Sequence, residues 1–236
     1  MVLHRFFIEP AIISGDKITI TDRGLIHQMK DVLRFGYGDK IIFLDNSGFE
    51  FLSQIENISK NSVVCNILER RKNLNEPEVK IRLYQSVIKK DSMELVVQKG
   101  VEVGIFDFMP IIATRSEKKD LNLDRLNKII REAAEQSGRG ILPKLHPPIP
   151  FEEAIHSLKK GTIIFFDKDA DNLSYFFESL HGQKDLNVFI GPEGGWSPEE
   201  MEIARETGAT IASLGLLTLK SETVGVIAAG VIFASM

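Results

Sequence analysis

A glycine-rich turn between a strand and a helix carries the residue types best suited to chemistry. Residues 187–190, apolar after Asn187, predict a buried strand, and Gly191-Pro192-Glu193-Gly194-Gly195 follows directly. Ligands of α/β sheets bind beyond the carboxyl ends of the strands, and glycines let backbone amides approach a ligand closely. Ser197 and Pro198 then predict the start of a helix. The pattern therefore predicts a binding loop.

The residues of this turn disfavour a phosphate ligand. Neither the Gly-x-Gly-x-x-Gly spacing of dinucleotide sites nor the Gly-Lys-Ser/Thr of phosphate loops is present. Glu193, Glu199 and Glu200 lie close to the start of the helix. A phosphate would bind at this positive end of the helix, and the three carboxylates would repel it. We expect a ligand with a neutral ring or a cationic centre. The alternative is a tight strand-to-helix connection that binds nothing.

A second loop, residues 214–223, precedes the last helix. Ser221 is expected to cap that helix, and Glu222 is expected to favour its positive end, with Lys220 just outside. The helix itself, expected over residues 222–234, contains several Gly and Ala residues that permit close approach of another backbone. It is therefore either central core or a tight subunit interface.

Basic residues gather in two stretches of a chain whose formal net charge is −4. In the second stretch a helix is expected to end at Gly138, the usual C-cap residue, with Arg139 following on a loop. The pattern is compatible with binding of a polyanion and also with a solvated helix face. The basic residues are Lys80, Arg82, Lys89 and Lys90 in the first stretch, and Arg115, Lys118, Lys119, Arg125, Lys128, Arg131, Arg139 and Lys144 in the second.

Other catalytic centres and a membrane span are not indicated. The histidines are scattered and no Ser-His-Asp or Cys-His spacing is present, so we expect neither a metal site nor an activated nucleophile. The single cysteine, Cys65, lies in an alternating apolar run and is predicted to be a buried strand residue. The N-terminus lacks the apolar stretch of a signal peptide, and residues 224–236 are too short to span a bilayer. We therefore expect a cytoplasmic protein.

The 236 residues, 43% of them hydrophobic, predict two modest domains with real cores. Residues 1–72 read as short strands around one helix at 21–34, a pattern typical of a small β-barrel. A polar linker is expected at 70–78, and residues 73–236 alternate strands with helices, which predicts a parallel sheet. The expected strands are 5–9, 17–20, 40–45, 50–58, 62–69, 79–87, 108–113, 162–167, 187–190 and 210–213; the expected helices are 92–103, 122–137, 151–158, 198–207 and 222–234.

Taken in order, these segments resemble the RsmE family of 16S ribosomal RNA methyltransferases, which belongs to the SPOUT superfamily of knotted, S-adenosylmethionine-dependent enzymes. The resemblance runs from end to end of the chain. It rests on Arg5-Phe6-Phe7, the helix His27 to Arg34 with Gly38-Asp39, Lys89 to Gly104, Thr114-Arg115-Ser116-Glu117, Glu135 to Arg139 with Pro143, Gly191 to Trp196, and Leu219-Lys220-Ser221-Glu222-Thr223.

The resemblance implies a fold and an activity. The fold is a PUA-like RNA-binding barrel at 1–72 followed by a SPOUT α/β domain at 73–236, with a deep trefoil knot at roughly 187–236. The activity is transfer of a methyl group from S-adenosylmethionine to N3 of a uridine in the decoding region of 16S rRNA, by a homodimer. The partner is 16S rRNA or the small ribosomal subunit.

The resemblance also implies roles for particular residues. Glu222 is the first expected base for the N3 proton and Glu193 the second, while Arg115, Arg139 or Lys220 would stabilise charge on the uracil oxygens. The expected cofactor-binding residues are Ile190, Gly191, Glu193, Gly194, Leu214, Gly215, Leu217, Leu219 and Thr223. The expected RNA-binding residues are Arg5, Arg34, Lys89, Lys90, Arg115, Lys118 and Arg139.

One position departs from the family pattern. The family is expected to show Leu-Arg-x-Glu-Thr where this chain has Lys220, and lysine keeps the charge without the planar fork that grips an anion with two hydrogen bonds. Two alternatives stay open: a knotted methyltransferase acting on another rRNA or tRNA position, and a non-catalytic RNA-binding assembly factor. Nucleotide hydrolysis is disfavoured because no phosphate loop is present.

Overall fold

The computed structural model describes residues 3–117, 120–158 and 160–236. The expected RNA contact Lys118 lies outside these residues. The chain divides into two compact units, the first comprising residues 1–76 with 134–142 and the second comprising 77–133 with 143–236. Residues 134–142, which the sequence analysis assigned to the second domain, thus belong to the first unit.

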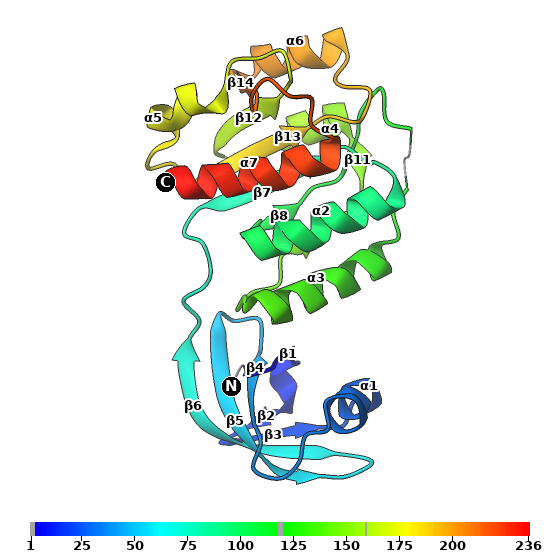
Figure 1. Cartoon of the computed structure of the whole chain (residues 1–236), viewed down its shortest axis with the longest axis vertical. Coiled ribbons are helices and arrows are strands. Elements are labelled where there is room, and N and C mark those ends of the chain that lie inside the picture. Colours follow the sequence, from blue (N-terminus) through cyan, green and yellow to red (C-terminus); the bar gives the residue numbers. More distant parts are fainter. Residues whose placement is uncertain (1–2, 118–119, 159) are drawn as a thin grey trace. The chain divides into compact units, whose positions relative to one another are not determined.

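The first unit is built on a six-stranded sheet of order β1-β4-β5-β6-β3-β2 (Figure 1). The neighbours β1 and β4 are parallel and the other pairs are antiparallel. The short strand β2, preceded by the 3-10 turn η1 at Pro10–Ile12, was not predicted, and β6 continues into the expected linker. The strands are β1 Arg5–Phe7, β2 Ile13–Ser14, β3 Lys17–Ile20, β4 Lys40–Leu44, β5 Phe49–Ile58 and β6 Val63–Lys72.

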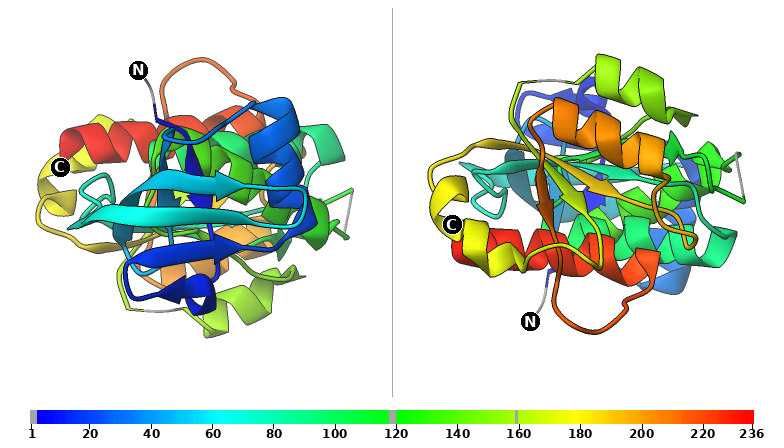
Figure 2. Two further views of the ribbon diagram at one scale, coloured as in Figure 1. Left: turned by 90° about the horizontal axis from the view of Figure 1, so that it is seen from below. Right: turned by 90° about the horizontal axis from the view of Figure 1, so that it is seen from above.

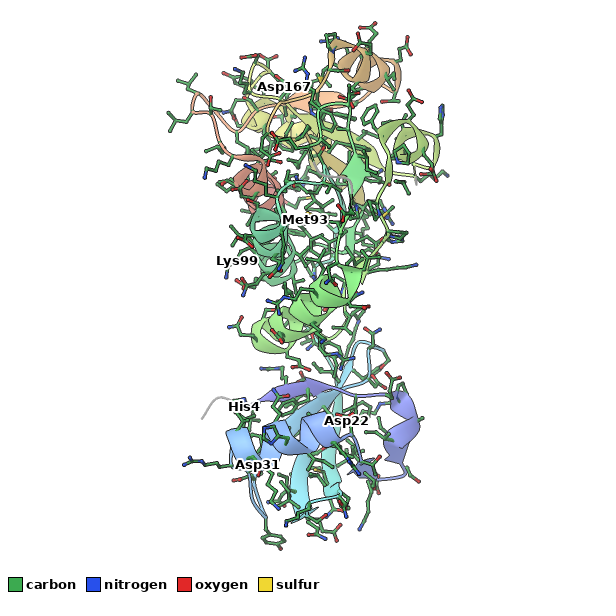
Figure 3. All side chains as sticks on the ribbon, turned by 90° about the vertical axis from the view of Figure 1, so that its right-hand side faces the viewer. His4, Asp22, Asp31, Met93, Lys99 and Asp167 are labelled. Carbon is green, nitrogen blue, oxygen red and sulfur yellow. The ribbon has the colours of Figure 1, made fainter. Side chains whose placement is uncertain are left out.

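The helix predicted at 21–34 forms as two consecutive segments. These are α1, Arg23–His27, and η2, Gln28–Val32, which is wound as a π-helix. Asp22, labelled in Figure 3, caps α1 because its Oδ1 accepts the Leu25 N–H at 2.8 Å. The helix buries its apolar side against the alternating strands, and the core so formed includes Ile18, Ile20, Ile26, Met29, Ile41, Phe43, Val63 and Cys65.

The second unit contains the predicted parallel sheet, of order β10-β8-β7-β13-β12-β14. Every neighbouring pair in it is parallel, as expected for strands that alternate with helices. The strand predicted at 108–113 is broken around Pro110, which has no N–H for a ladder, and its second half pairs instead in a separate two-stranded sheet. The strands are β7 Lys80–Gln85, β8 Asp107–Phe108, β9 Ile111–Ile112, β10 Lys144–Leu145, β11 Ile149–Pro150, β12 Thr162–Phe166, β13 Asp185–Ile190 and β14 Thr210–Ala212.

Helices cover both faces of this sheet: α2 and α7 lie on one face, and α4 and α6 lie on the other (Figure 2). Under α4 and α6, the rings of Tyr84, Phe189 and Phe165 stack across three adjacent strands with 4.3 Å between successive centroids. Phe151 and Trp196 pack against this stack. The helices are α2 Lys90–Val103, α3 Leu123–Ser137, α4 Phe151–His156, α6 Pro198–Glu206 and α7 Ser221–Ser235, with the unpredicted short turns η3 Leu173–Phe176 and α5 Phe177–Leu180.

The long helices do not resemble membrane spans. Among the described residues, no helix combines the length and the apolar character that crossing a bilayer requires.

Strand β13 lies between β7 and β12, so the carboxyl ends of three strands meet at one edge of the sheet. In α/β sheets this edge is where ligands bind.

Candidate active site

A cavity of about 790 Å³ lies at this edge of the second unit. Three loops line it: residues 166–169 after β12, residues 190–196 after β13, and residues 213–222 between β14 and α7. Lys89, Ser92, Arg115 and Val224 complete the lining. The two loops singled out from the sequence, distant along the chain, thus share one cavity, as the strand order requires.

The glycine-rich turn is held in a fixed shape. The Gly195 N–H donates to the Pro192 carbonyl at 2.9 Å, and Gly195 has φ +70°, a conformation that favours glycine. A Cβ on Gly191 would lie 3.2 Å from the indole of Trp196, and the indole Nε1 donates to the Phe166 carbonyl at 3.1 Å. The turn is therefore packed against the end of β12, and a side chain at Gly191 would press on the Trp196 indole.

The start of α6 explains the acidic residues next to this turn. Ser197 caps the helix as predicted, in a capping box whose second member is Glu200. The buried Glu200 carboxylate accepts the backbone N–H groups of Ser197 and Thr114, each at 2.8 Å, so it is a structural group and does not line the cavity. The pKa of Glu199 is lowered by hydrogen bonds from its own backbone N–H and from Ser197, with a smaller contribution from the nearby charge of Arg115.

Ser221 does not cap the last helix, contrary to the sequence prediction. Lys220, whose side chain has no acceptor, occupies the N-cap position of α7, and Ser221, the first residue of the helix, donates its hydroxyl to the Gly191 carbonyl at 2.6 Å. The same hydroxyl accepts from Nε2 of Gln85, at the end of β7, at 2.8 Å. Gln85, Ser221 and Gly191 are thus linked by two buried hydrogen bonds, which join β7, α7 and the glycine-rich turn. Gln85 was not predicted from the sequence, although a polar residue at the end of an apolar strand was a usable signal.

The loop before α7 offers a wall of free backbone groups. Among the described residues, no partner is found for the backbone N–H and C=O groups of residues 214–219. The base of this loop is fixed, since the backbone of Ser213 donates to the Asp171 carbonyl at 2.7 Å and accepts from the Leu173 N–H at 2.8 Å. Leu216 is fully exposed at the tip. Backbone groups without partners bind water or a ligand, so this wall suits a neutral heterocycle with several hydrogen-bonding edges.

Charged side chains of both signs line the cavity. Asp167, at the end of β12 (Figure 3), and Asp169 were missed from the sequence, although the carboxyl end of the predicted strand pointed there. Arg115 donates from Nη1 to the Gly194 carbonyl at 2.9 Å. A mixed lining of this kind accommodates a ligand that carries a cationic centre. No group of three metal-ligating side chains occurs in the described part of the chain.

The cavity gathers most of the expected site residues. Thr223 and Lys90 do not line it: Thr223 donates its N–H to the Lys220 carbonyl, and Lys90 is exposed at the start of α2. Arg5, Arg34 and Arg139 belong to the first unit. Those that line the cavity are Ile190, Gly191, Glu193, Gly194, Leu214, Gly215, Leu217 and Leu219 from the cofactor set, and Lys89, Arg115, Lys220 and Glu222 from the others.

Arg139 differs most from expectation. Its side chain is buried, with 4% of the residue exposed, and its Nη2 lies 2.8 Å from Oε2 of Glu76. A guanidinium held this way is shielded from solvent within the first unit, so the structure gives Arg139 a packing environment in place of the catalytic or RNA-binding one predicted. The sequence showed an arginine after a helix C-cap and gave no sign of its partner.

Comparison with known proteins identifies the class to which this fold and cavity belong. A family model described as RNA methyltransferase domain matches residues 75–233, and one described as RNA methyltransferase PUA domain matches residues 25–68. The chain is thus an RNA methyltransferase-fold protein with a PUA-like domain. It belongs to the family of ribosomal RNA small subunit methyltransferase E.

Relatives from this family and solved methyltransferase structures match along the whole chain. The protein of Rickettsia conorii is 30% identical, covering 97% of this chain and 94% of its own, and that of Bacillus subtilis is 28% identical, covering 94% and 92%. A crystal structure of ribosomal RNA small subunit methyltransferase E from Neisseria gonorrhoeae, bound to S-adenosylmethionine, superposes with a TM-score of 0.90 at 26% identity, covering 99% and 98%. The structure of a methyltransferase from Legionella pneumophila in complex with the cofactor superposes with a TM-score of 0.88 at 26% identity, covering 100% of this chain and 98% of its own.

Proposed function

We propose that this chain transfers the methyl group of S-adenosylmethionine to N3 of a uridine in the decoding region of 16S rRNA. The observation that carries the proposal is the cavity formed by the glycine-rich turn and residues 214–219, in a family with a solved member that holds S-adenosylmethionine. The reaction is a direct displacement, so positioning of the two reactants supplies much of its acceleration.

The residues that line the cavity fit this cofactor. The cofactor supplies a methyl group activated on a sulfonium cation, beside a neutral adenine. The unpartnered backbone groups of residues 214–219 suit the edges of adenine and ribose, with Ile190, Leu217 and Leu219 giving apolar contact. Gly191 and Gly194 line the cavity with backbone, and the carboxylates of Glu193 and Asp167 favour the cationic centre.

Residues of this chain also serve the acceptor base. Forming the bond from uracil N3 to the methyl carbon breaks the carbon–sulfur bond and requires the N3 proton to leave. Glu222, in the first turn of α7, accepts this proton, with Glu193 as the second candidate. Arg115 and Lys220 stabilise the negative charge that develops on the uracil oxygens.

The finer architecture of the family belongs to the same proposal. Residues 187–236 form a trefoil knot, residues 1–72 act as the RNA-binding barrel of a cytoplasmic protein, and residues 73–236 form the transferase domain. Two subunits pair along α7, where Ile227 is exposed and a Cβ on Gly230 would meet no atom within 4 Å. Apolar and small residues left open on a helix support a packed interface.

The test is transfer of tritiated methyl groups from S-adenosylmethionine to a 16S rRNA transcript and to small subunits that lack the modification. Mass mapping of the product should place one added methyl group on uridine N3. RNA binding without transfer on both substrates would indicate an assembly factor. A methyl group found on tRNA or at another rRNA position would show a different substrate and overturn the proposal.

A further inference from the structure

We propose that the segment Arg34–Asp39 of the first unit is a docking site for an unpaired RNA nucleotide, with the Tyr37 ring stacking on the base and the Arg34 guanidinium contacting a phosphate. The inference rests on the proposed function, because it names the surface that holds the RNA substrate. We call this segment the Tyr37 turn.

The first observation is the exposure of Tyr37. It leaves 84% of its surface exposed, in a unit whose other aromatic residues largely pack into or against the core. Large aromatic rings are usually at least half buried because burial of their surface is favourable. A ring displayed to this extent is suited to stacking on a nucleobase, which is how proteins bind single-stranded RNA.

The second observation is that the turn is rigid. The Gly36 N–H donates to the Asp39 carboxylate at 2.8 Å, and the Asp39 N–H returns to the Gly36 carbonyl at 3.3 Å. Gly38 donates its N–H to the Ile55 carbonyl at 2.9 Å and accepts from Nε2 of Gln54 at 2.9 Å. Tyr37 is thus presented from a fixed backbone, which lowers the entropy lost when a ligand orders it.

The third observation is the backbone of Arg34. It has φ +58°, the left-handed conformation that usually ends a helix at glycine or asparagine. Arginine is strained there, and it follows the π-helix η2, itself a rare structure that recurs at functional sites. Strain retained at a position where glycine would relieve it points to a use for the side chain.

The local charge suits a phosphate. Arg34 is exposed, and among the described residues it has no ion-pair partner. The two carboxylates nearest to Arg34 in the sequence are engaged, Asp31 (labelled in Figure 3) with His27 Nδ1 at 2.7 Å and Asp39 with the turn itself. An exposed cation three positions from an exposed ring in the same segment, with the nearest acidic residues in sequence occupied, matches one nucleotide with its phosphate.

Two substitutions separate this role from a structural one. Tyr37→Ala should weaken binding of a 16S rRNA transcript about tenfold, as loss of one base stack predicts, while Tyr37→Phe should bind like the parent. Tyr175→Ala, at a tyrosine in the second unit that is 78% exposed, is the matched control and should change nothing. Arg34→Gly should weaken RNA binding several-fold and lower its salt dependence, yet leave the melting temperature unchanged or higher. Lys60→Gly, on an exposed hairpin of the same unit, is the control for loss of one charge.

The readouts keep this proposal distinct from the proposed function. In steady-state transfer assays, Tyr37→Ala should raise KM for RNA while kcat and the affinity for S-adenosylmethionine stay unchanged. The proposal is overturned if Tyr37→Ala binds RNA as tightly as Tyr175→Ala, or if Arg34→Gly lowers the melting temperature and leaves RNA affinity unchanged. A parent protein that binds RNA through Tyr37 but transfers no methyl group would contradict the proposed function alone.

Discussion

Arg139 and Glu76 form a buried ion pair of 2.8 Å although 63 residues separate them in the chain. Oε1 of Glu76 also accepts the N–H groups of Gly140 at 2.9 Å and Ile141 at 3.0 Å. One carboxylate thus holds three donors of the segment 134–142, which is why that segment belongs with residues 1–76. The ion pair therefore joins residues 134–142 to residues 1–76 within the first unit.

Arg139→Ala should therefore destabilise the protein. Removal of Arg139 leaves the partly buried Glu76 carboxylate with only the N–H donors of Gly140 and Ile141, which costs about 3 kcal/mol. Urea unfolding should show this loss of unfolding free energy, while calorimetric affinity for S-adenosylmethionine stays unchanged because the cavity lies in the second unit. Arg205→Ala, which removes an exposed pair with Glu202, should cost no more than about 0.5 kcal/mol. A fall in kcat with unchanged stability would instead return Arg139 to the catalytic role predicted from the sequence.

Ser221→Ala should loosen the glycine-rich turn. The substitution deprives the Gly191 carbonyl and the Gln85 amide of their shared partner, and buried polar groups without partners cost about 1–3 kcal/mol. We expect weaker binding of S-adenosylmethionine in calorimetric titration, together with lower stability. Ser235→Ala removes a hydroxyl at the other end of the same helix and serves as the control. Equal cofactor affinity in the two variants would show that the hydrogen bonds of Ser221 to Gly191 and Gln85 do not position the turn.

Glu222→Gln tests the proposed base. The amide keeps the shape of the side chain but cannot accept the N3 proton, and a positioned general base contributes about 10²- to 10⁴-fold to rate. Single-turnover methyl transfer should slow by at least about 100-fold with cofactor affinity retained. Glu206→Gln, at the exposed end of α6, should transfer at the parental rate. If Glu222→Gln kept the parental rate, Glu193 or water would be the group that accepts the N3 proton.

Cys65 gives a prediction for alkaline pH. Burial raises the pKa of its thiol from 9.0 to about 12, so the folded protein keeps a proton that the unfolded chain loses above pH 9. The folded state therefore binds more protons between about pH 9 and 12, and the free energy of unfolding contributed by this group falls as pH rises through that window. A thiol reagent at pH 8 should label Cys65, the single cysteine, only as fast as the first unit opens. Prompt labelling of the native protein would contradict this burial. Cys65→Ala should show a shallower loss of stability above pH 9.

Local patterns account for what could be predicted from the sequence. The alternation around Cys65, the Ser197 cap, and the strand-then-glycine turn at Gly191 each depend on residues a few positions apart. The parallel sheet followed from the alternation of strands and helices, although its strand order did not.

The missed features depend on partners distant in the chain. Ser221 was assigned to its own helix because nothing local reveals that Gly191 and Gln85 lie beside it. Arg139 was assigned to catalysis or RNA binding for the same reason, since its partner Glu76 lies in the segment predicted to be a linker. Residue type and spacing describe the donors and acceptors that a chain carries, and the tertiary fold decides which of them meet.

The place of β13 also has a consequence for biosynthesis. This strand separates β7 from β12, yet it is made after both, and neither of those strands pairs with the other. A nascent chain therefore exposes β7 and β12 outside the ribosome before their common central partner exists, and pairings of such long sequence separation form slowly. Ribosome-stalled chains that end before residue 185 should therefore remain protease-sensitive in the second unit, and protection should rise once residues 185–190 have emerged.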